Sequence, residues 1–177
     1  MKELRHGSRK VNKEVKRGNT AIKRSSHSVP YKAHLKAGRL EGKKVLDYGC
    51  GRGFDVIECQ KKGLDVQGFD RFQEGWDSLP VGEFDVVTCN YVLNVIEDPV
   101  ERKAVLEEIK SLGREAYITV RSDLKSIKPS WEPMNDGYYT SGKTFQKIYT
   151  VDSLKAEFGD VEIIANNNTG IMFKIGA

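Results

Sequence analysis

VLDYGCGRG, residues 45–53, decides the fold because it leads from a hydrophobic strand into a helix through three closely spaced glycines. The pattern predicts a buried strand at 44–48, a helix at 54–62 and a second strand at 65–69. Glycine permits a tight bend and a close approach of ligand to backbone, and the first turn of a helix offers unpaired N–H groups. The stretch therefore predicts a ligand-binding β-α-β unit.

The glycine spacing and two carboxylates indicate the kind of ligand. A dinucleotide fingerprint requires G-x-G-x-x-G, but here the third glycine falls one position early, at Gly53. Asp47, at the end of the first strand, would repel a pyrophosphate but suits a ligand with ammonium and sulfonium charge. Asp70 follows the second strand, nineteen positions after Gly51, where a carboxylate accepts hydrogen bonds from ribose hydroxyls. Together these features predict a site for adenosine linked to an amino acid.

The rest of the chain continues the alternation of strands and helices. Strands are predicted at 84–89 and 116–120, with a helix between them that begins at Asp98 and ends at Gly113. A helix at 151–158 and an antiparallel hairpin at 161–176 close the chain. The fold class is therefore α/β, with a Rossmann-like, doubly wound and mostly parallel sheet. Residues 121–150 are predicted to be a long irregular connection that covers the ligand.

One interval is too short for the usual pattern of such a sheet. About fourteen residues separate Asp70 from Phe84, which leaves little room for a helix and a full third strand. The sheet is expected to lack that strand, and the adenine contact normally made there falls to Phe72, Trp76 or Asp77.

Basic residues are concentrated at one end of the chain. Residues 1–44 carry fourteen Lys and Arg against three Asp and Glu, although the net charge of the chain is only +4. The sequence predicts a basic N-terminal arm at 1–28 and a single domain at 29–177. Such an arm attracts phosphates, so nucleic acid is a candidate partner, although an ordinary solvated arm explains the same charge.

Other classes of protein and site are not expected. No stretch approaches the ~20 apolar residues that cross a bilayer, and no signal peptide is evident, so the sequence predicts a cytoplasmic protein without membrane contact. The three cysteines lack C-x-x-C spacing, and the three histidines are scattered, so no metal site is predicted.

Three stretches resemble the successive motifs of class I S-adenosylmethionine-dependent methyltransferases: VLDYGCGRG, GFD (68–70) and LPVGEFDVVTCNYVLNVIED (79–98). The resemblance implies methyl transfer with S-adenosylmethionine as cofactor. In that class the glycine loop faces the methionine part, the acid after the second strand binds the ribose, and residues after the fourth strand line the cofactor. The cofactor-binding residues are then Asp47, Gly49, Cys50, Gly51, Asp70, Arg71, Asn90 and Tyr91.

A closer resemblance involves residues 19–38, 90–102 and 136–150. These stretches are similar to methyltransferases associated with DNA phosphorothioation systems, and the similarity favours nucleic acid as the methyl acceptor. Alternatives are a small-molecule methyltransferase and a non-catalytic regulatory module that binds S-adenosylmethionine. The catalytic base is unknown, with His27, Tyr138, Tyr139 and Lys147 as candidates. The candidate substrate-binding residues are Lys23, Arg24, Tyr138, Tyr139 and Lys143.

Overall fold

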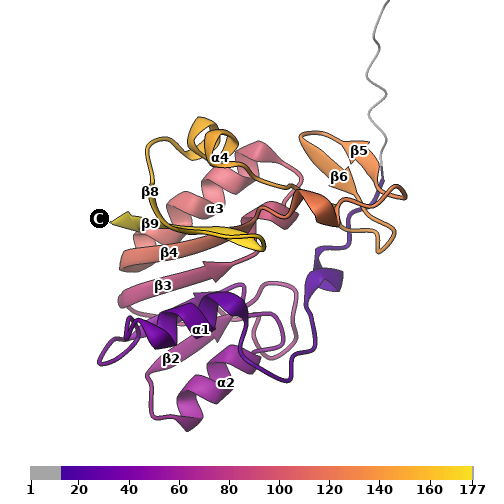
Figure 1. Cartoon of the computed structure of the whole chain (residues 1–177). Helices are drawn as coiled ribbons and strands as arrows, with labels where there is room; N and C mark the ends of the chain where they lie inside the picture. The colour runs from indigo at the N-terminus through magenta and orange to yellow at the C-terminus, as the bar shows by residue number, and fades with distance from the viewer. Residues whose placement is uncertain (1–12, 177) are drawn as a thin grey trace, which may run out of the picture.

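A computed structural model describes residues 13–176, so the first twelve residues of the predicted arm lie outside the described part of the chain. Its centre is a six-stranded sheet in the order β2-β1-β3-β4-β9-β8 (Figure 1). The four strands β1 to β4 are parallel, whereas β9 runs antiparallel to both β4 and β8. The predicted α/β class with a terminal antiparallel hairpin is confirmed. The strands of this sheet are β1 (Val45–Tyr48), β2 (Val66–Phe69), β3 (Phe84–Asn90), β4 (Gly113–Arg121), β8 (Glu162–Asn166) and β9 (Gly170–Gly176).

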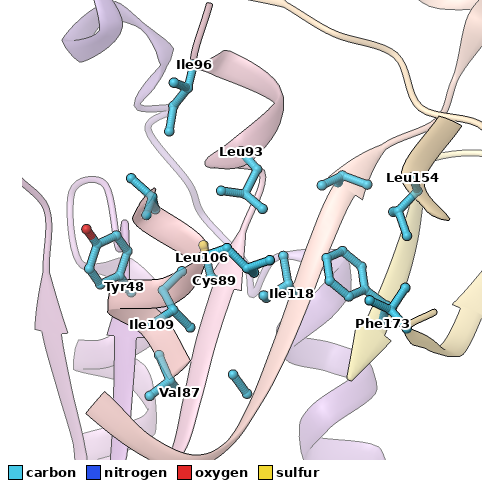
Figure 2. Close-up of a cluster of buried hydrophobic side chains, with 14 of the residues drawn as sticks. Tyr48, Val87, Cys89, Leu93, Ile96, Leu106, Ile109, Ile118, Leu154 and Phe173 are labelled. Carbon is cyan, nitrogen blue, oxygen red and sulfur yellow. The ribbon is translucent and has the colours of Figure 1, made fainter. Parts of the chain in front are cut away.

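Helices cover both faces of the sheet, as expected of a doubly wound fold. One face packs against α1 (Val29–Lys36) and α2 (Phe54–Lys61), and the other against α3 (Pro99–Leu112) and α4 (Val151–Phe158). Side chains alternate across each strand, so β1 sends Leu46 to the second face and Val45 to the first. Figure 2 shows the core of the second face, where Leu106 and Ile109 of α3 lie against the strands.

Two helices begin with a capping side chain and a proline in the first turn. Ser28 caps α1, where its side chain accepts a hydrogen bond from the Tyr31 amide and a proline occupies the first turn. Asp98 caps α3 in the same way through the Val100 amide. These caps satisfy N–H groups that have no partner inside the helix. The proline in each first turn has no N–H to satisfy, which suits the same position.

The expected loss of the third strand is confirmed. Residues 70–83, all of them described, contain neither helix nor strand, and the chain crosses from β2 to β3 on the other side of β1. Trp76 fills part of the space, because its indole ring lies against Gly68 and Gly53. A Cβ added at Gly68 would lie 2.8 Å from that ring, so a side chain there would displace the tryptophan.

The expectation of an irregular connection at 121–150 is corrected. This segment contains a three-stranded antiparallel sheet of β5 (Glu132–Met134), β6 (Gly137–Tyr139) and β7 (Phe145–Gln146). Buried Phe145 packs against Gly137, which has no side chain to block the contact. The strands are only two or three residues long, and strands this short give little periodicity to read.

The described part of the predicted arm lies on this small sheet. Its amide at Lys16 donates to the Lys143 carbonyl at 2.7 Å, and the Tyr139 hydroxyl donates to the Glu14 carbonyl at 3.3 Å. A short 3-10 helix follows at Arg17–Thr20 (Figure 1). The boundary between an arm at 1–28 and a domain at 29–177 stays a prediction.

One buried histidine makes the stability of the fold depend on pH. His34 is fully buried between Tyr31 and Tyr117, and neither ring nitrogen has a hydrogen-bond partner among residues 13–176. Burial, helped by the charge of Arg39, lowers the pKa of His34 to about 4. The unfolded chain therefore binds this proton more readily, and stability present above the unfolded pKa of about 6.5 is lost as the pH falls towards 4.

We expect His34 to cost the wild-type protein roughly 2.5 kcal/mol of unfolding free energy between pH 7.5 and pH 4.5. Urea denaturation at both pH values measures the loss, and a His34→Leu variant serves as the comparison because it has nothing to protonate. The variant should lose less stability than the wild type by that amount. Equal losses in the two proteins would assign the acid sensitivity to other groups.

Candidate functional site

A cavity of about 460 Å³ opens at the carboxyl ends of β1, β2, β3 and β4. Parallel sheets bind ligands at this edge. The structure brings together at this cavity all eight residues predicted to bind the cofactor: Asp47, Gly49, Cys50, Gly51, Asp70, Arg71, Asn90 and Tyr91.

The glycine loop adopts a backbone that requires glycine. Gly49 has φ 83° and Gly51 has φ 59°, both in the left-handed region. A Cβ at Gly49 would also collide with the Val92 side chain. The loop therefore passes close to the residues that follow β3. Because Gly49 and Gly51 have no side chains, a ligand in the cavity can contact their backbone directly.

Asp47 forms a buried acidic floor to the cavity. Its Oδ1 accepts a hydrogen bond from Thr88 Oγ1 at 3.0 Å, and the Tyr31 hydroxyl lies 3.2 Å from the same Oγ1. Burial raises the pKa of Asp47 to about 7, and the charge of Asp55 adds to the rise, while the hydrogen bonds from Thr88 and Tyr31 oppose it. Near neutral pH this carboxyl group is poised to ionise when a cation enters the cavity.

A second buried carboxylate, Asp55, also lines the cavity. Its Oδ1 accepts hydrogen bonds from His27 Nδ1 at 2.8 Å and from the Ser28 amide at 3.1 Å. Asp55 was missed by the sequence analysis. Its place in the first turn of the helix after the glycine loop was the available signal, since the N–H groups there favour an acid.

The contacts of His27 argue against its candidate role as a base. Lys62 Nζ donates to His27 Nε2 at 3.1 Å, so the imidazole carries its proton on Nδ1 and donates it to Asp55. Both ring nitrogens are engaged, and His27 is not among the residues that line the cavity. It positions Asp55 instead.

Asp70 holds the glycine loop in place. Its Oδ2 accepts from the Gly51 amide at 2.8 Å, and its Oδ1 accepts from the Phe72 amide at 3.0 Å. Each carboxylate oxygen has a second lone pair, so the side chain keeps capacity for two more donors. Phe72 lines the cavity, in line with its predicted part in the adenine contact, whereas Trp76 and Asp77 do not line it.

Two asparagines near the end of β3 have buried polar atoms that find no hydrogen-bond partner within residues 13–176. Both side-chain polar atoms of Asn90 are buried and unpaired, as is Oδ1 of Asn94, whose Nδ2 donates to Gln146 Oε1 at 3.1 Å. All three side chains line the cavity. An unpaired buried polar atom is costly, so these amides indicate a bound polar ligand.

The other catalytic and substrate-binding candidates are mostly elsewhere. Tyr138 and Tyr139 belong to β6 and, like exposed Lys23 and Lys143, are absent from the cavity lining. Arg24 alone of the substrate-binding candidates lines it.

Lys147 is committed to a buried ion network. Its Nζ donates to Asp136 Oδ2 at 2.8 Å and to Glu157, and it does not line the cavity. Two carboxylates hold this ammonium as ion-pair partners. A role as the general base is therefore not supported.

Arg17 of the predicted arm closes one side of the cavity. Its Nε donates to Glu97 at 3.0 Å, and its two terminal nitrogens donate to Glu101 at 2.5 and 2.7 Å. Beside it, Gln73 donates to the Gly18 carbonyl at 3.2 Å. At least one cation of the arm thus has its partners inside this chain.

Comparisons with known proteins identify the family and the fold. The methyltransferase domain family matches residues 24–161. The ubiquinone biosynthesis O-methyltransferase of Acinetobacter baumannii is 32% identical, over 51% of this chain and 49% of that protein. The chain thus spans about half the length of the curated relatives it matches.

Two solved structures share the fold at low sequence identity. One is a 1,6-didemethyltoxoflavin-N1-methyltransferase of Burkholderia thailandensis with bound 1,6-didemethyltoxoflavin and S-adenosylhomocysteine. It is 18% identical with a TM-score of 0.55, covering 82% of this chain and 76% of that one. The other, an S-adenosylmethionine-dependent methyltransferase from Clostridium acetobutylicum, is 15% identical with a TM-score of 0.55, covering 83% and 89%. In the part of this chain that the structure describes, no helix is long and apolar enough to span a membrane.

Proposed function

This chain belongs to the methyltransferase domain family, and we propose that it transfers a methyl group from S-adenosylmethionine to a small-molecule acceptor. One observation carries the proposal: Asp47 and Asp70 flank a side-chain-free glycine loop in the same cavity. That arrangement suits a ligand with a cationic amino-acid part and a ribose.

The residues present fit this cofactor. Asp47 faces the ammonium and sulfonium charges, and Asp70 accepts from the ribose hydroxyls with its free lone pairs. The unpaired amide of Asn90 supplies a donor and an acceptor beside the glycine loop. When bound, S-adenosylmethionine supplies a methyl group activated by attachment to a sulfonium. Phe72 and Arg71 line the same cavity and would contact the adenine in place of the missing third strand.

The protein contributes mainly alignment and exclusion of water. Methyl transfer from a sulfonium gains much of its rate when the acceptor atom, the methyl carbon and the sulfur are held in line in a dry pocket. Among the residues that line the cavity, Asn94 offers an unpaired carbonyl oxygen to a donor on the acceptor. An acceptor with an O–H or N–H group satisfies that oxygen.

Three findings favour a small acceptor over nucleic acid. By their names, the ubiquinone O-methyltransferase and the toxoflavin N1-methyltransferase act on small molecules. Arg17 of the arm binds Glu97 and Glu101 rather than facing solvent, so it is not free to bind phosphates. The cavity volume is also near the lower end of the range for small-ligand pockets.

The state of Asp47 gives this proposal a pH dependence. A ligand ammonium favours the carboxylate, so binding requires ionisation of a group whose pKa is about 7 in the free protein. We expect the affinity for S-adenosylhomocysteine, measured by calorimetry, to fall roughly 25-fold from pH 7.5 to pH 5.5. An Asp47→Asn variant should bind weakly and with little pH dependence. The same pH dependence in that variant would contradict the role of Asp47.

Transfer of labelled methyl groups tests the acceptor. The protein is incubated with methyl-labelled S-adenosylmethionine and, separately, with a metabolite fraction below 1 kDa, with DNA and with RNA. We expect label in the small-molecule fraction and little effect of added salt. Label that appears in DNA or RNA and falls steeply with added salt would contradict this expectation. It would favour nucleic acid as the acceptor, bound through the phosphates by the basic arm at 1–28.

Nucleic acid is the second candidate acceptor, and the excess of basic residues in 1–44 is the observation behind it. The association with DNA phosphorothioation systems is part of the same reading and stays a prediction. The third reading, a regulatory module without activity, predicts cofactor binding with no labelled product in any fraction. A single robust turnover would exclude it.

A further inference from the structure

We propose that Asp55 is a further binding residue for the cofactor, and that its free carboxylate oxygen accepts a hydrogen bond from the ammonium group of the methionine part. The inference rests on the proposed function and deepens it, because it states how the cavity distinguishes the whole ligand from its fragments. Asp55 lies in the first turn of α2, directly after the glycine loop, and lines the same cavity as Asp47.

One of the two carboxylate oxygens of Asp55 is already engaged. Oδ1 accepts hydrogen bonds from the His27 imidazole and the Ser28 amide, and these two donors fix the orientation of the carboxylate. Oδ2 accepts no hydrogen bond from residues 13–176, and it is not sealed from solvent as the unpaired atoms of Asn90 are. Since Asp55 is only 8% exposed and lines the cavity, this oxygen is open to a ligand there.

Asp55 has no cation in direct contact. Its His27 partner is neutral, because Nε2 accepts a hydrogen bond from a lysine and the single ring proton therefore lies on Nδ1. Buried Glu157 shows the contrast, since it pairs with both Arg102 and Lys147. A buried carboxylate without a positive partner is costly, so a cationic group that enters the cavity is stabilised beside Asp55.

The start of α1 holds Asp55 and Asp47 in one hydrogen-bonded chain. The Ser28 amide donates to Asp55, and the Ser28 hydroxyl accepts from the Tyr31 amide. The Tyr31 hydroxyl in turn lies 3.2 Å from Thr88 Oγ1, which donates to Asp47. Burial and then the charge of Asp55 raise the pKa of Asp47, as expected of two carboxylates that face a small shared space. One ammonium group between them relieves their repulsion.

This arrangement predicts selectivity for a ligand with its amino group intact. An ammonium group has three N–H donors, enough to reach both carboxylates. S-adenosylhomocysteine without its amino group keeps only a carboxylate at this end, which Asp47 and Asp55 repel. 5′-Methylthioadenosine lacks the amino-acid part altogether, so its binding is independent of Asp55.

Calorimetric titration at pH 8 tests the inference, because Asp47 is then mostly ionised in the free protein. The ligands are S-adenosylhomocysteine, the same molecule without its amino group, and 5′-methylthioadenosine. The proteins are wild type, Asp55→Asn and Glu58→Gln. Asparagine keeps an acceptor oxygen for the donors on Oδ1 but removes the charge. Glu58 is the matched control, because this acid lies one turn later on α2 and does not line the cavity.

We expect Asp55→Asn to bind S-adenosylhomocysteine about tenfold or more weakly than the wild type, since a hydrogen bond between two charged groups is lost. The ligand without an amino group should bind this variant at least as tightly as it binds the wild type, because a repulsive charge is gone. 5′-Methylthioadenosine should bind all three proteins equally, which also shows that the variants are folded. Glu58→Gln should match the wild type throughout.

Three results would overturn the inference. The first is an unchanged affinity of Asp55→Asn for S-adenosylhomocysteine. The second is equal weakening of the ligand without an amino group, which would make Asp55 a structural residue of the glycine loop. The third is equal weakening by Glu58→Gln, which would show a long-range effect of charge. If S-adenosylhomocysteine does not bind the wild type, the proposed function fails; if it binds and Asp55→Asn matches the wild type, only this inference fails.

A His27→Gln variant supplies a second test that also applies if Asp55→Asn does not fold. It leaves the charge of Asp55 in place but removes the imidazole that orients the carboxylate. The affinity for S-adenosylhomocysteine should fall several-fold, and that for the ligand without an amino group should not fall. Equal losses for the two ligands, or no loss for either, would contradict the role of Asp55.

Discussion

Replacing Asp70 by alanine is expected to weaken the binding of S-adenosylhomocysteine about 100-fold or more. The substitution removes the acceptor for two ribose hydroxyls, and hydrogen bonds to a charged group contribute more than neutral ones. It also releases the Gly51 and Phe72 amides, so the glycine loop loses the contacts that hold its shape. Calorimetric titration of the purified variant measures the loss.

Asp77→Ala is the matched control for this substitution. Asp77 lies in the same segment between β2 and β3, is exposed and does not line the cavity. Its replacement should leave the affinity within about twofold, since exposed positions away from a site have small effects. Thermal unfolding of both variants checks that the fold is retained. If the folded Asp70→Ala protein binds as tightly as the wild type, the ribose lies elsewhere.

Replacing Arg102 by methionine is expected to lower the free energy of unfolding by about 3 kcal/mol or more. Arg102 is fully buried, and it donates to Glu157 Oε1 at 2.5 Å, to the Ile96 carbonyl at 2.8 Å and to Asp136. Methionine fills much of the volume but leaves buried carboxylate oxygens of Glu157 and the carbonyl without a donor. Urea denaturation measures the change.

The adjacent position supplies the control. Lys103 on the same helix is exposed, so Lys103→Met should change the unfolding free energy by no more than about 0.5 kcal/mol. The network joins α3, α4 and the segment that carries the small sheet, through Arg102, Glu157 and Asp136. Arg102→Met with the stability of the wild type would show that Lys147 alone satisfies both carboxylates.

The sequence predicted which residues meet at the ends of β1 and β2 better than it predicted where the catalytic and substrate-binding candidates lie, for a physical reason. Asp47, Gly49, Gly51 and Asp70 lie at the ends of two strands joined by one helix, so strand and helix periodicity fixes where they meet. These four residues come together through a single β-α-β unit, so short-range sequence patterns are enough to place them. The missing third strand was also predictable, because it follows from the length of a single interval.

The surroundings of the catalytic candidates depend on contacts between residues far apart in the sequence. Lys147 and His27 were chosen as candidate bases because their segments were expected to cover the sheet edge, but partners at Glu157 and Lys62 occupy them. A single sequence does not show which distant side chains will pair in the folded protein. The strands of the small sheet were missed because two or three residues cannot display a period.

A crystal structure of the protein with S-adenosylhomocysteine tests the central claim most directly. The account predicts the ribose hydroxyls within hydrogen-bond distance of Asp70 and the ammonium group facing Asp47, with Asn90 paired to the ligand. A ligand bound outside this cavity, or a cavity that stays empty at saturating ligand, would contradict the assignment of the cofactor site.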